Sequence, residues 1–298
     1  MGKGASGPFR LYINLPANIA INWILLFLKN SSHFCCPPQP MKTPYKMNNS
    51  ENRELTLFTQ FNVSSADTDM NARLRPGALV NFLIQSAIQS ADSLGFGFGN
   101  LSQERLFWVL SRMKIEIYRP LKWNEDIIVE TWPKDVDGLI YLRDFIIRDQ
   151  SDSVVVRAST AWLAINLESK RPGKVEGIGA SILDRLRNKF ALETHPEKLP
   201  AIHTSATAEK TVTYFDLDLN KHVTSTRYID WMIDCMPVDY LATHYPSNIT
   251  LNYMKETRLG DQLIFHFSND KTDVFDFEGI QKAYSQTAVR GKIEFSTI

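Results

Sequence analysis

The sequence predicts an α+β protein in which two antiparallel sheets each wrap around a central helix. Two observations lead to this class. The order strand, loop, helix and then several strands occurs twice after residue 50, and both helices are apolar over much of their circumference. A helix with so wide an apolar surface has to be covered on more than one side. Two such units can join edge to edge into one long sheet, which also removes exposed strand edges.

The first unit, residues 47–170, opens with a strand in the β-rich segment 55–64. Pro76 and Gly77 lead into an amphipathic helix of about four turns. Gly95, Gly97 and Gly99 follow this helix, so they indicate a C-cap and a turn; the glycines of a phosphate-binding loop precede a helix. Four strand-like runs complete the unit, at 108–118, 126–132, 139–148 and 154–167.

The second unit, residues 206–298, repeats this order. A strand over 210–214 and a loop over 215–223 precede a helix over 226–241. Strands are expected at 249–254, 262–268 and 279–295, the last one interrupted by a turn. Residues 171–205 form the linker between the units; the linker carries three prolines and a short helix near 181–192.

Residue matches support an internal repeat. A shift of 149 positions superposes two copies of the pattern D-x-D-x-N, each lying between a strand and a helix: Val63, Asp67, Asp69 and Asn71 on Val212, Asp216, Asp218 and Asn220. One step further, Arg73 falls opposite His222. After the helix the shift is 136, which places Pro120 opposite Glu256. Neither Arg73 nor Pro120 transfers protons at neutral pH, so the repeat predicts one active site per chain, in the second unit.

Composition excludes several classes of protein. Lys plus Arg and Asp plus Glu both number 33, and a net charge of zero disfavours a nucleic-acid-binding protein. The three cysteines, Cys35, Cys36 and Cys235, cannot form a disulfide framework, so we expect a reducing, cytoplasmic compartment. The sequence lacks G-x-S-x-G, Walker and C-x-x-C motifs. Their absence excludes serine hydrolases with a nucleophile elbow, NTPases and common zinc ribbons as classes for this protein.

The first 46 residues differ in composition from the rest of the chain. An apolar stretch over 11–28 follows Lys3 and Arg10, but Pro16 and three asparagines leave a strongly apolar part shorter than the ~20 residues of a membrane span. We expect an untranslated or disordered leader, with synthesis starting at Met41 or Met47; a targeting segment and a membrane anchor stay open as alternatives.

Three separated segments resemble the acyl-ACP thioesterases of plants and bacteria. They are F-W-V-L-S-R-M-K-I-E-I-Y-R-P-L-K-W-N-E-D-I-I-V-E-T-W, A-S-T-A-W-L-A-I-N-L-E-S-K-R-P-G-K-V and D-L-D-L-N-K-H-V-T-S-T-R-Y-I-D-W-M. The resemblance extends from about residue 52 to 297. It implies a tandem hotdog fold and hydrolysis of the thioester that joins a fatty acyl group to acyl carrier protein, without a cofactor.

The resemblance also implies site residues. The family's D-x-N-x-H motif matches Asp218, Asn220 and His222, and its later carboxylate matches Glu256. Many plant members have a cysteine directly after that glutamate. Thr257 stands there in this chain, which argues against a cysteine nucleophile.

Thioester hydrolysis assigns roles to these residues. It needs an activated water, donors for the oxyanion and a proton for the departing thiol. We expect Glu256 to be the base, directly or through His222, with Asn220 positioning the water or the carbonyl and Asp218 orienting His222. A backbone N–H within 224–226, at the helix start, would bind the oxyanion. A metal site in this loop is disfavoured because the candidate ligands do not follow the regular spacing of a calcium-binding loop.

The substrate sets further expectations. The acyl chain would lie in an apolar tunnel beside the first-unit helix, although core packing accounts equally well for the candidate wall residues Leu79, Phe82, Leu83 and Trp108. Carrier proteins are acidic as a class, so a basic rim is expected; its candidates are Arg171, Lys174, Arg185, Arg187 and Lys189. The alternative functions are a hotdog thioesterase acting on acyl-CoA, a dehydratase and a non-catalytic acyl-binding sensor. The chain could be a monomer or a homodimer.

Overall fold

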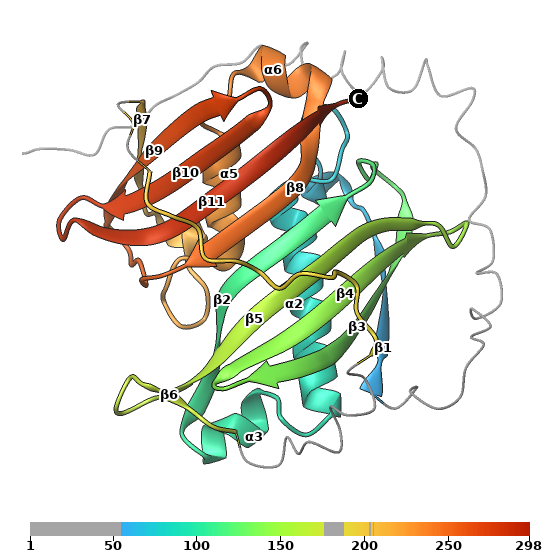
Figure 1. Ribbon diagram of the computed structural model, residues 1–298, viewed down its shortest axis with the longest axis vertical. Coiled ribbons are helices and arrows are strands. Elements are labelled where there is room, and N and C mark those ends of the chain that lie inside the picture. Colours follow the sequence, from blue (N-terminus) through green and yellow to red (C-terminus); the bar gives the residue numbers. More distant parts are fainter. Residues whose placement is uncertain (1–54, 176–187, 203, 205) are drawn as a thin grey trace, which may run out of the picture. The chain divides into compact units, whose positions relative to one another are not determined.

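The computed structural model describes residues 55–175, 188–202, 204 and 206–298 (Figure 1). The leader predicted over 1–46 lies outside the described residues, as does most of the helix predicted near 181–192. The described end of that helix, 188–192, is not helical. Within the described ranges, no helix combines the length and the hydropathy that crossing a membrane would take.

One antiparallel sheet runs through both units. The first unit contributes β1 (Leu57–Asn62), β2 (Leu106–Ile117), β3 (Asp126–Asp137), β4 (Ile140–Asp149) and β5 (Val154–Asn166). The second contributes β7 (Thr207–Thr211), β8 (His244–Tyr253), β9 (Gln262–Lys271), β10 (Val274–Gln281) and β11 (Gln286–Thr297). The strand order is β1-β3-β4-β5-β2-β8-β11-β10-β9-β7, and the two-residue β6 (Pro172–Gly173) pairs with β5.

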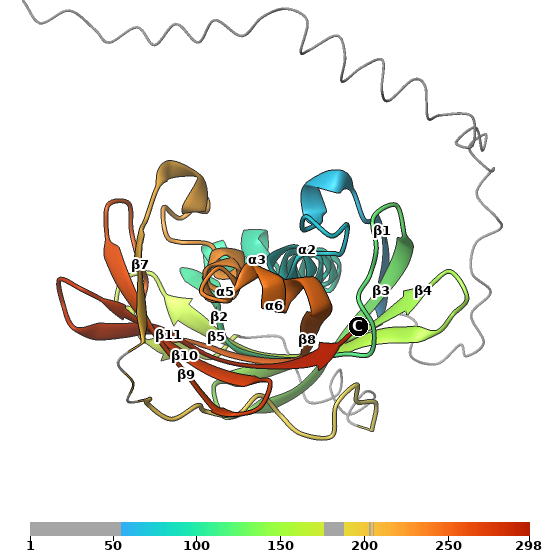
Figure 2. The same ribbon diagram turned by 90° about the horizontal axis from the view of Figure 1, so that it is seen from above.

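The two units join through β2 and β8. Arg112 to Glu116 pair antiparallel with Asn252 to Asn248, so the edge strand of each unit is covered by the other. The predicted edge-to-edge sheet is confirmed. Figure 2 shows α2 (Pro76–Ser93) and α5 (Ser225–Ile233) side by side on the concave face of this sheet.

Two helix predictions were wrong in detail. The helix predicted over 226–241 is two helices, α5 and α6 (Val238–Thr243), because Pro237 has no N–H to donate and its ring obstructs a continuing helix. Gly95 has a φ of +81° just after α2, as a helix end requires. The glycine-rich segment is not only a turn, however, since α3 (Phe98–Gln103) follows Gly97.

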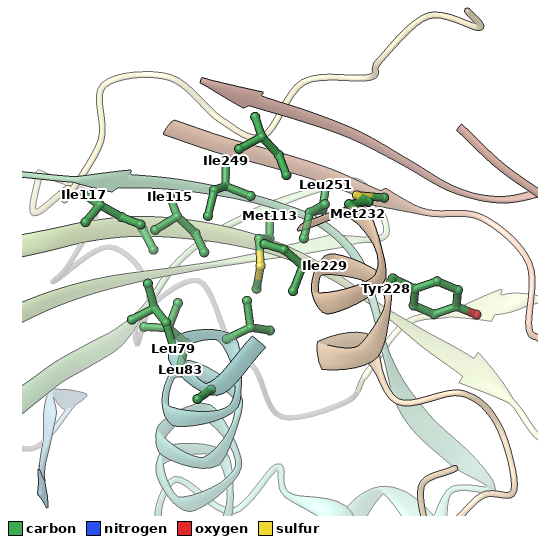
Figure 3. Close-up of a cluster of buried hydrophobic side chains, with 14 of the residues drawn as sticks. Leu79, Leu83, Met113, Ile115, Ile117, Tyr228, Ile229, Met232, Ile249 and Leu251 are labelled. Atoms are coloured by element: carbon green, nitrogen blue, oxygen red, sulfur yellow. The ribbon is translucent and has the colours of Figure 1, made fainter. Parts of the chain in front are cut away.

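The core is shared between the units. Side chains from both helices and from the two joining strands form one buried cluster (Figure 3). Its members include Leu79, Leu83, Met113, Ile115, Ile229, Met232, Ile249 and Leu251. The helices therefore pack on the central strands and on each other, and the main core belongs to both units.

Candidate functional site

The loop between β7 and α5 is shaped by its own aspartates. Asp216 Oδ2 accepts hydrogen bonds from the N–H and the hydroxyl of Thr213, each 2.7 Å long. Asp218 Oδ1 accepts the N–H groups of Asn220 (2.8 Å) and His222 (3.2 Å). Lys221 completes the turn with a φ of +64°. These local bonds place His222 directly before α5.

The same loop occurs in the first unit, 149 residues earlier. Asp67 accepts the N–H of Ser64 at 3.0 Å, and Asp69 Oδ1 accepts those of Asn71 (2.8 Å) and Arg73 (2.9 Å). The helices that follow begin at Pro76 and Ser225, also 149 residues apart. The repeat found in the sequence is therefore a repeat of hydrogen-bonding geometry.

Glu256 reaches the loop from the end of β8. The Val223 N–H donates to the carbonyl of Thr257 (2.8 Å), and the hydroxyl of Tyr228 on α5 donates to Thr257 Oγ1 (2.9 Å). The side-chain amide of Gln281 donates to the Glu256 carbonyl (2.8 Å). These three bonds tie the backbone around Glu256 to the loop, to α5 and to β10.

The result is a contact between His222 and Glu256. His222 Nε2 lies 3.1 Å from Glu256 Oε2, with the histidine side chain 24% exposed and the glutamate 52% exposed. Arg258 approaches the same carboxylate oxygen at 3.7 Å. Water can therefore reach the Glu256 carboxylate. The less exposed His222 imidazole contacts that carboxylate from the interior of the protein.

The other two predicted residues are placed differently. One carboxylate oxygen of Asp218 accepts hydrogen bonds from the backbone N–H groups of Asn220 and His222. Asp218 therefore holds the loop that carries the imidazole. Asn220 is exposed at the tip of the loop. Among the four predicted residues as described, the structure records one side-chain contact, that of His222 with Glu256.

The first turn of α5 offers free donors. The Thr224 N–H is bonded to the Asp216 carbonyl (2.9 Å), so it is removed from the predicted range of oxyanion donors. The N–H groups of Ser225 and Thr226 have no acceptor among the described residues. Unpaired N–H groups at a helix N-terminus attract negative charge.

The first two positions of α2, by contrast, offer no free donor. Pro76 has no N–H, and the Gly77 N–H donates to Asp230 Oδ1 on α5 (3.2 Å). The other oxygen of Asp230 binds Arg75 (3.1 Å). The unit that lacks the His222–Glu256 pair therefore also lacks free donors at the first two positions of its helix.

Arg73 occupies the place of His222 in the first unit and is buried there. It pairs with Asp69 (2.7 Å) and donates to the carbonyl of Leu241 at the end of α6 (2.8 Å). Arg73 thus links the two units and donates a hydrogen bond to a carbonyl group at the C-terminus of α6.

The four predicted acyl-chain residues fall into two groups. Leu79 and Leu83 belong to the shared core, where Phe82 stacks on Phe61 with ring centroids 4.6 Å apart. Trp108 instead lines an apolar pocket of about 80 Å³. Its indole N–H donates to the Phe96 carbonyl (2.9 Å). Further lining residues of this pocket are Ala87, Ala91, Tyr141, Leu142 and Trp162.

Sequence reasoning missed one residue of this pocket, Arg143. Its side chain is almost fully buried, and its NH1 donates to Ser90 Oγ (2.8 Å) and Thr131 Oγ1 (3.2 Å). Burial lowers the pKa of Arg143 to about 9. No carboxylate among the described residues forms an ion pair with it. The only signal in the sequence was a cation inside a strand-like run.

The candidates for the predicted basic rim lie on several parts of the chain. Lys189 pairs with Glu130 (2.6 Å) and lies 4.1 Å from the centroid of the Trp132 ring. Arg171 and Lys174 flank β6, and Arg185 and Arg187 lie outside the described residues. The basic side chains next to His222 and Glu256 are instead those of Lys221, Lys255 and Arg258.

Comparisons with known proteins identify a family for both units. Residues 54–178 match the acyl-ACP thioesterase N-terminal domain and residues 200–297 match the acyl-ACP thioesterase C-terminal domain. The oleoyl-acyl carrier protein thioesterase of Coriandrum sativum is 30% identical over 226 residues, which are 70% of this chain. The dodecanoyl-[acyl-carrier-protein] hydrolase of Cinnamomum camphora is 28% identical over 62% of this chain. The matches span 61% and 52% of those relatives' own lengths.

Solved structures agree with the architecture. An acyl-ACP thioesterase from Bacteroides thetaiotaomicron is 30% identical with a TM-score of 0.73, covering 83% of this chain and 100% of that one. The 12:0-ACP thioesterase from Umbellularia californica has a TM-score of 0.71 at 20% identity, covering 82% and 98% of the two chains, and shows likeness of fold alone.

Proposed function

Since the chain belongs to the acyl-ACP thioesterase family, with its tandem hotdog fold, we propose that it hydrolyses fatty acyl-ACP to free fatty acid and carrier protein. The observation that carries this proposal is the 3.1 Å contact between His222 and the half-exposed Glu256. Free helix N–H groups, those of Ser225 and Thr226, lie in the same loop-to-helix segment, three and four residues after His222. A base, a proton donor and oxyanion donors are the three groups that thioester hydrolysis requires.

In the proposed reaction Glu256 removes a proton from a water molecule, whose oxygen attacks the thioester carbonyl carbon. The N–H groups of Ser225 and Thr226 stabilise the oxyanion. As the carbon–sulfur bond breaks, His222 gives its proton to the departing sulfur. The proton held by Glu256 then passes to His222 across their contact, which restores both groups.

Asn220 and Asp218 have supporting roles in this proposal. The exposed amide of Asn220 positions the water or the carbonyl, and Asp218 orients His222 through the loop backbone. The bond from the His222 N–H to Asp218 supports this role, because the bond restricts where the imidazole can lie.

The acyl chain is proposed to follow α2 into the pocket beside Trp108. The helical lining of the pocket begins at Ala87, ten residues after Gly77, which is about 15 Å along the helix. Trp108 would contact the chain directly, while Leu79, Phe82 and Leu83 form the packed wall behind it. The names of the relatives mention oleoyl and dodecanoyl groups, which supports a long alkyl chain here.

The test compares His222→Ala and Glu256→Gln with the unchanged protein, by following thiol release from acyl-ACP and acyl-CoA series. We expect each substitution to lower kcat about 10²-fold or more, because general acid–base catalysis contributes that much. His195→Ala and Glu193→Gln, at exposed positions of the linker, are the matched controls and should have no effect.

Other outcomes select the alternatives. Undiminished turnover in both site variants would refute the assignment of these residues. Equal kcat/KM for CoA and carrier thioesters would favour the acyl-CoA thioesterase. Tight binding of acyl-ACP without any turnover would favour the sensor.

A further inference from the structure

The loop that carries His222 exposes large apolar side chains. Tyr214 is 75% exposed and Phe215 is 83% exposed, and their rings touch edge to face with centroids 5.3 Å apart. Leu219, at the tip of the same loop, is fully exposed. Figure 2 shows this loop, between β7 and α5, standing above the concave face of the sheet. Exposed clusters of this kind mark interaction surfaces more often than isolated apolar residues do.

The repeat shows that the aromatic pair is not needed to build the loop. At the shift of 149, Ser65 and Ala66 stand in place of Tyr214 and Phe215. Both copies form the same one-turn 3-10 helix with the same capping bonds. Because Ser-Ala supports this geometry as well as Tyr-Phe, the aromatic rings serve something other than folding. The counterpart of Leu219 is Met70, which is also exposed, so Leu219 carries less of this argument.

Positive charge near these loops also differs between the two units. Lys221 and Lys255 are exposed neighbours in sequence of His222 and Glu256, and neither forms an ion pair with a carboxylate of the described residues. The first-unit counterpart of Lys221 is Ala72, which adopts a similar φ of +58°. The counterpart of Lys255 is Arg119, whose charge is engaged by Glu125 and Asp149. At these two positions, therefore, the second-unit site has uncompensated cations and its first-unit copy does not.

We propose that Tyr214, Phe215, Lys221 and Lys255 form the docking surface for the carrier protein that bears the thioester. The proposal rests on the proposed function, since the carrier protein is the partner that would bring the thioester to Glu256. Tyrosine and phenylalanine are enriched at the cores of protein interfaces. Rim lysines complement an acidic partner and mainly speed its association.

The test replaces three of these residues with their first-unit counterparts, as Tyr214→Ser, Phe215→Ala and Lys221→Ala combined. The first unit shows that this loop folds with those residues. We expect kcat/KM for acyl-ACP to fall about tenfold or more, as loss of an interface hot spot does. The kcat/KM for the same acyl group on N-acetylcysteamine, which has no carrier, should stay within about twofold. The reverse changes, Ser65→Tyr and Ala66→Phe, should leave both values unchanged.

Four outcomes would overturn the proposal. Equal losses on both substrates would place these side chains in the reaction itself. Unchanged acyl-ACP kinetics, with loss of binding to vesicles of phosphatidylglycerol and phosphatidylcholine, would assign the surface to a membrane. Unchanged kinetics with a dimer converted to a monomer would assign it to self-association, and unchanged kinetics with neither effect would leave the surface without this role.

Failure of the proposed function is distinguishable from failure of docking. If the unchanged protein hydrolyses no acyl thioester, the function fails; calorimetric titration with acyl-ACP then tests docking alone. Binding that the triple variant lacks would support the docking surface. Equal binding by both proteins would overturn it.

Discussion

At the scale of single residues, Thr257 and Tyr228 hold the acid/base pair in register. Thr257 is fully buried, so it cannot reach a substrate, yet its hydroxyl and carbonyl bind α5 and the loop. Burial raises the pKa of Tyr228 to about 12, so its hydroxyl remains a donor throughout the neutral range. We therefore expect Thr257, which stands where many plant members have a cysteine, to act as a positioning residue.

Removal of the hydrogen bond between Tyr228 and Thr257 should affect turnover more than substrate binding. We expect Tyr228→Phe and Thr257→Val each to lower kcat about tenfold with KM little changed, because a small misplacement of a base is costly. Thr257→Ser keeps the hydroxyl and should restore activity. Tyr245→Phe, which removes another buried tyrosine bond, to the Leu74 carbonyl, should lower stability by about 1 kcal/mol and spare kcat. A Thr257→Val protein with normal kcat and pH profile would contradict this role.

At the scale of elements, the N-termini of α2 and α5 differ in the hydrogen bonding of their backbone N–H groups. The terminus of α5 keeps free donors, while Asp230 closes that of α2 by approaching Gly77 closely. A Cβ atom on Gly77 would lie 2.3 Å from Asp230 Oδ1. Glycine is therefore required there by a close contact between helices, at a position where its φ is ordinary.

Gly77→Ala should consequently destabilise the protein by about 1–3 kcal/mol, the cost of displacing a buried carboxylate from its partners. Gly99→Ala in α3 is the matched control, since a Cβ there would meet nothing within 4 Å. It should be neutral or stabilising by up to about 1 kcal/mol, because alanine favours helix more than glycine does. Urea unfolding measures both changes, and equal stability of the two variants would contradict the proposed contact.

At the scale of the whole molecule, the two units share their sheet and their core. The β2–β8 ladder, the common apolar cluster and the bonds of Arg73 to Leu241 all cross between them. A unit unfolding alone would expose the core of its neighbour. The protein should therefore unfold in a single calorimetric transition with equal calorimetric and van't Hoff enthalpies. Two resolved transitions would show that the units are independent domains.

Much of this architecture followed from sequence patterns with a local cause. The start of α2 at Pro76, the paired Asp loops and the strands depend on propensity, periodicity and short-range hydrogen bonds, which the sequence displays directly. The break in the second helix at Pro237 was equally visible, but continuing apolar periodicity obscured it. His222 and Glu256 were found because they depart from the repeat, where Arg73 and Pro120 stand.

Other features depend on residues far apart in the sequence. The burial of Arg143, the closure of α2 by Asp230 and the engagement of Lys189 with Trp132 arise only when strands and helices meet. Periodicity reports which face of an element is apolar and not what packs against it.

By itself, the sequence indicated a diverged duplication and predicted proton-transferring residues in its second copy. This could be read because the same local hydrogen bonds recur at a constant spacing. Only the tertiary structure decided that His222 and Glu256 are in contact and that one helix terminus is open and the other closed. Those features depend on distances between elements, which are set by packing of the shared core around both helices.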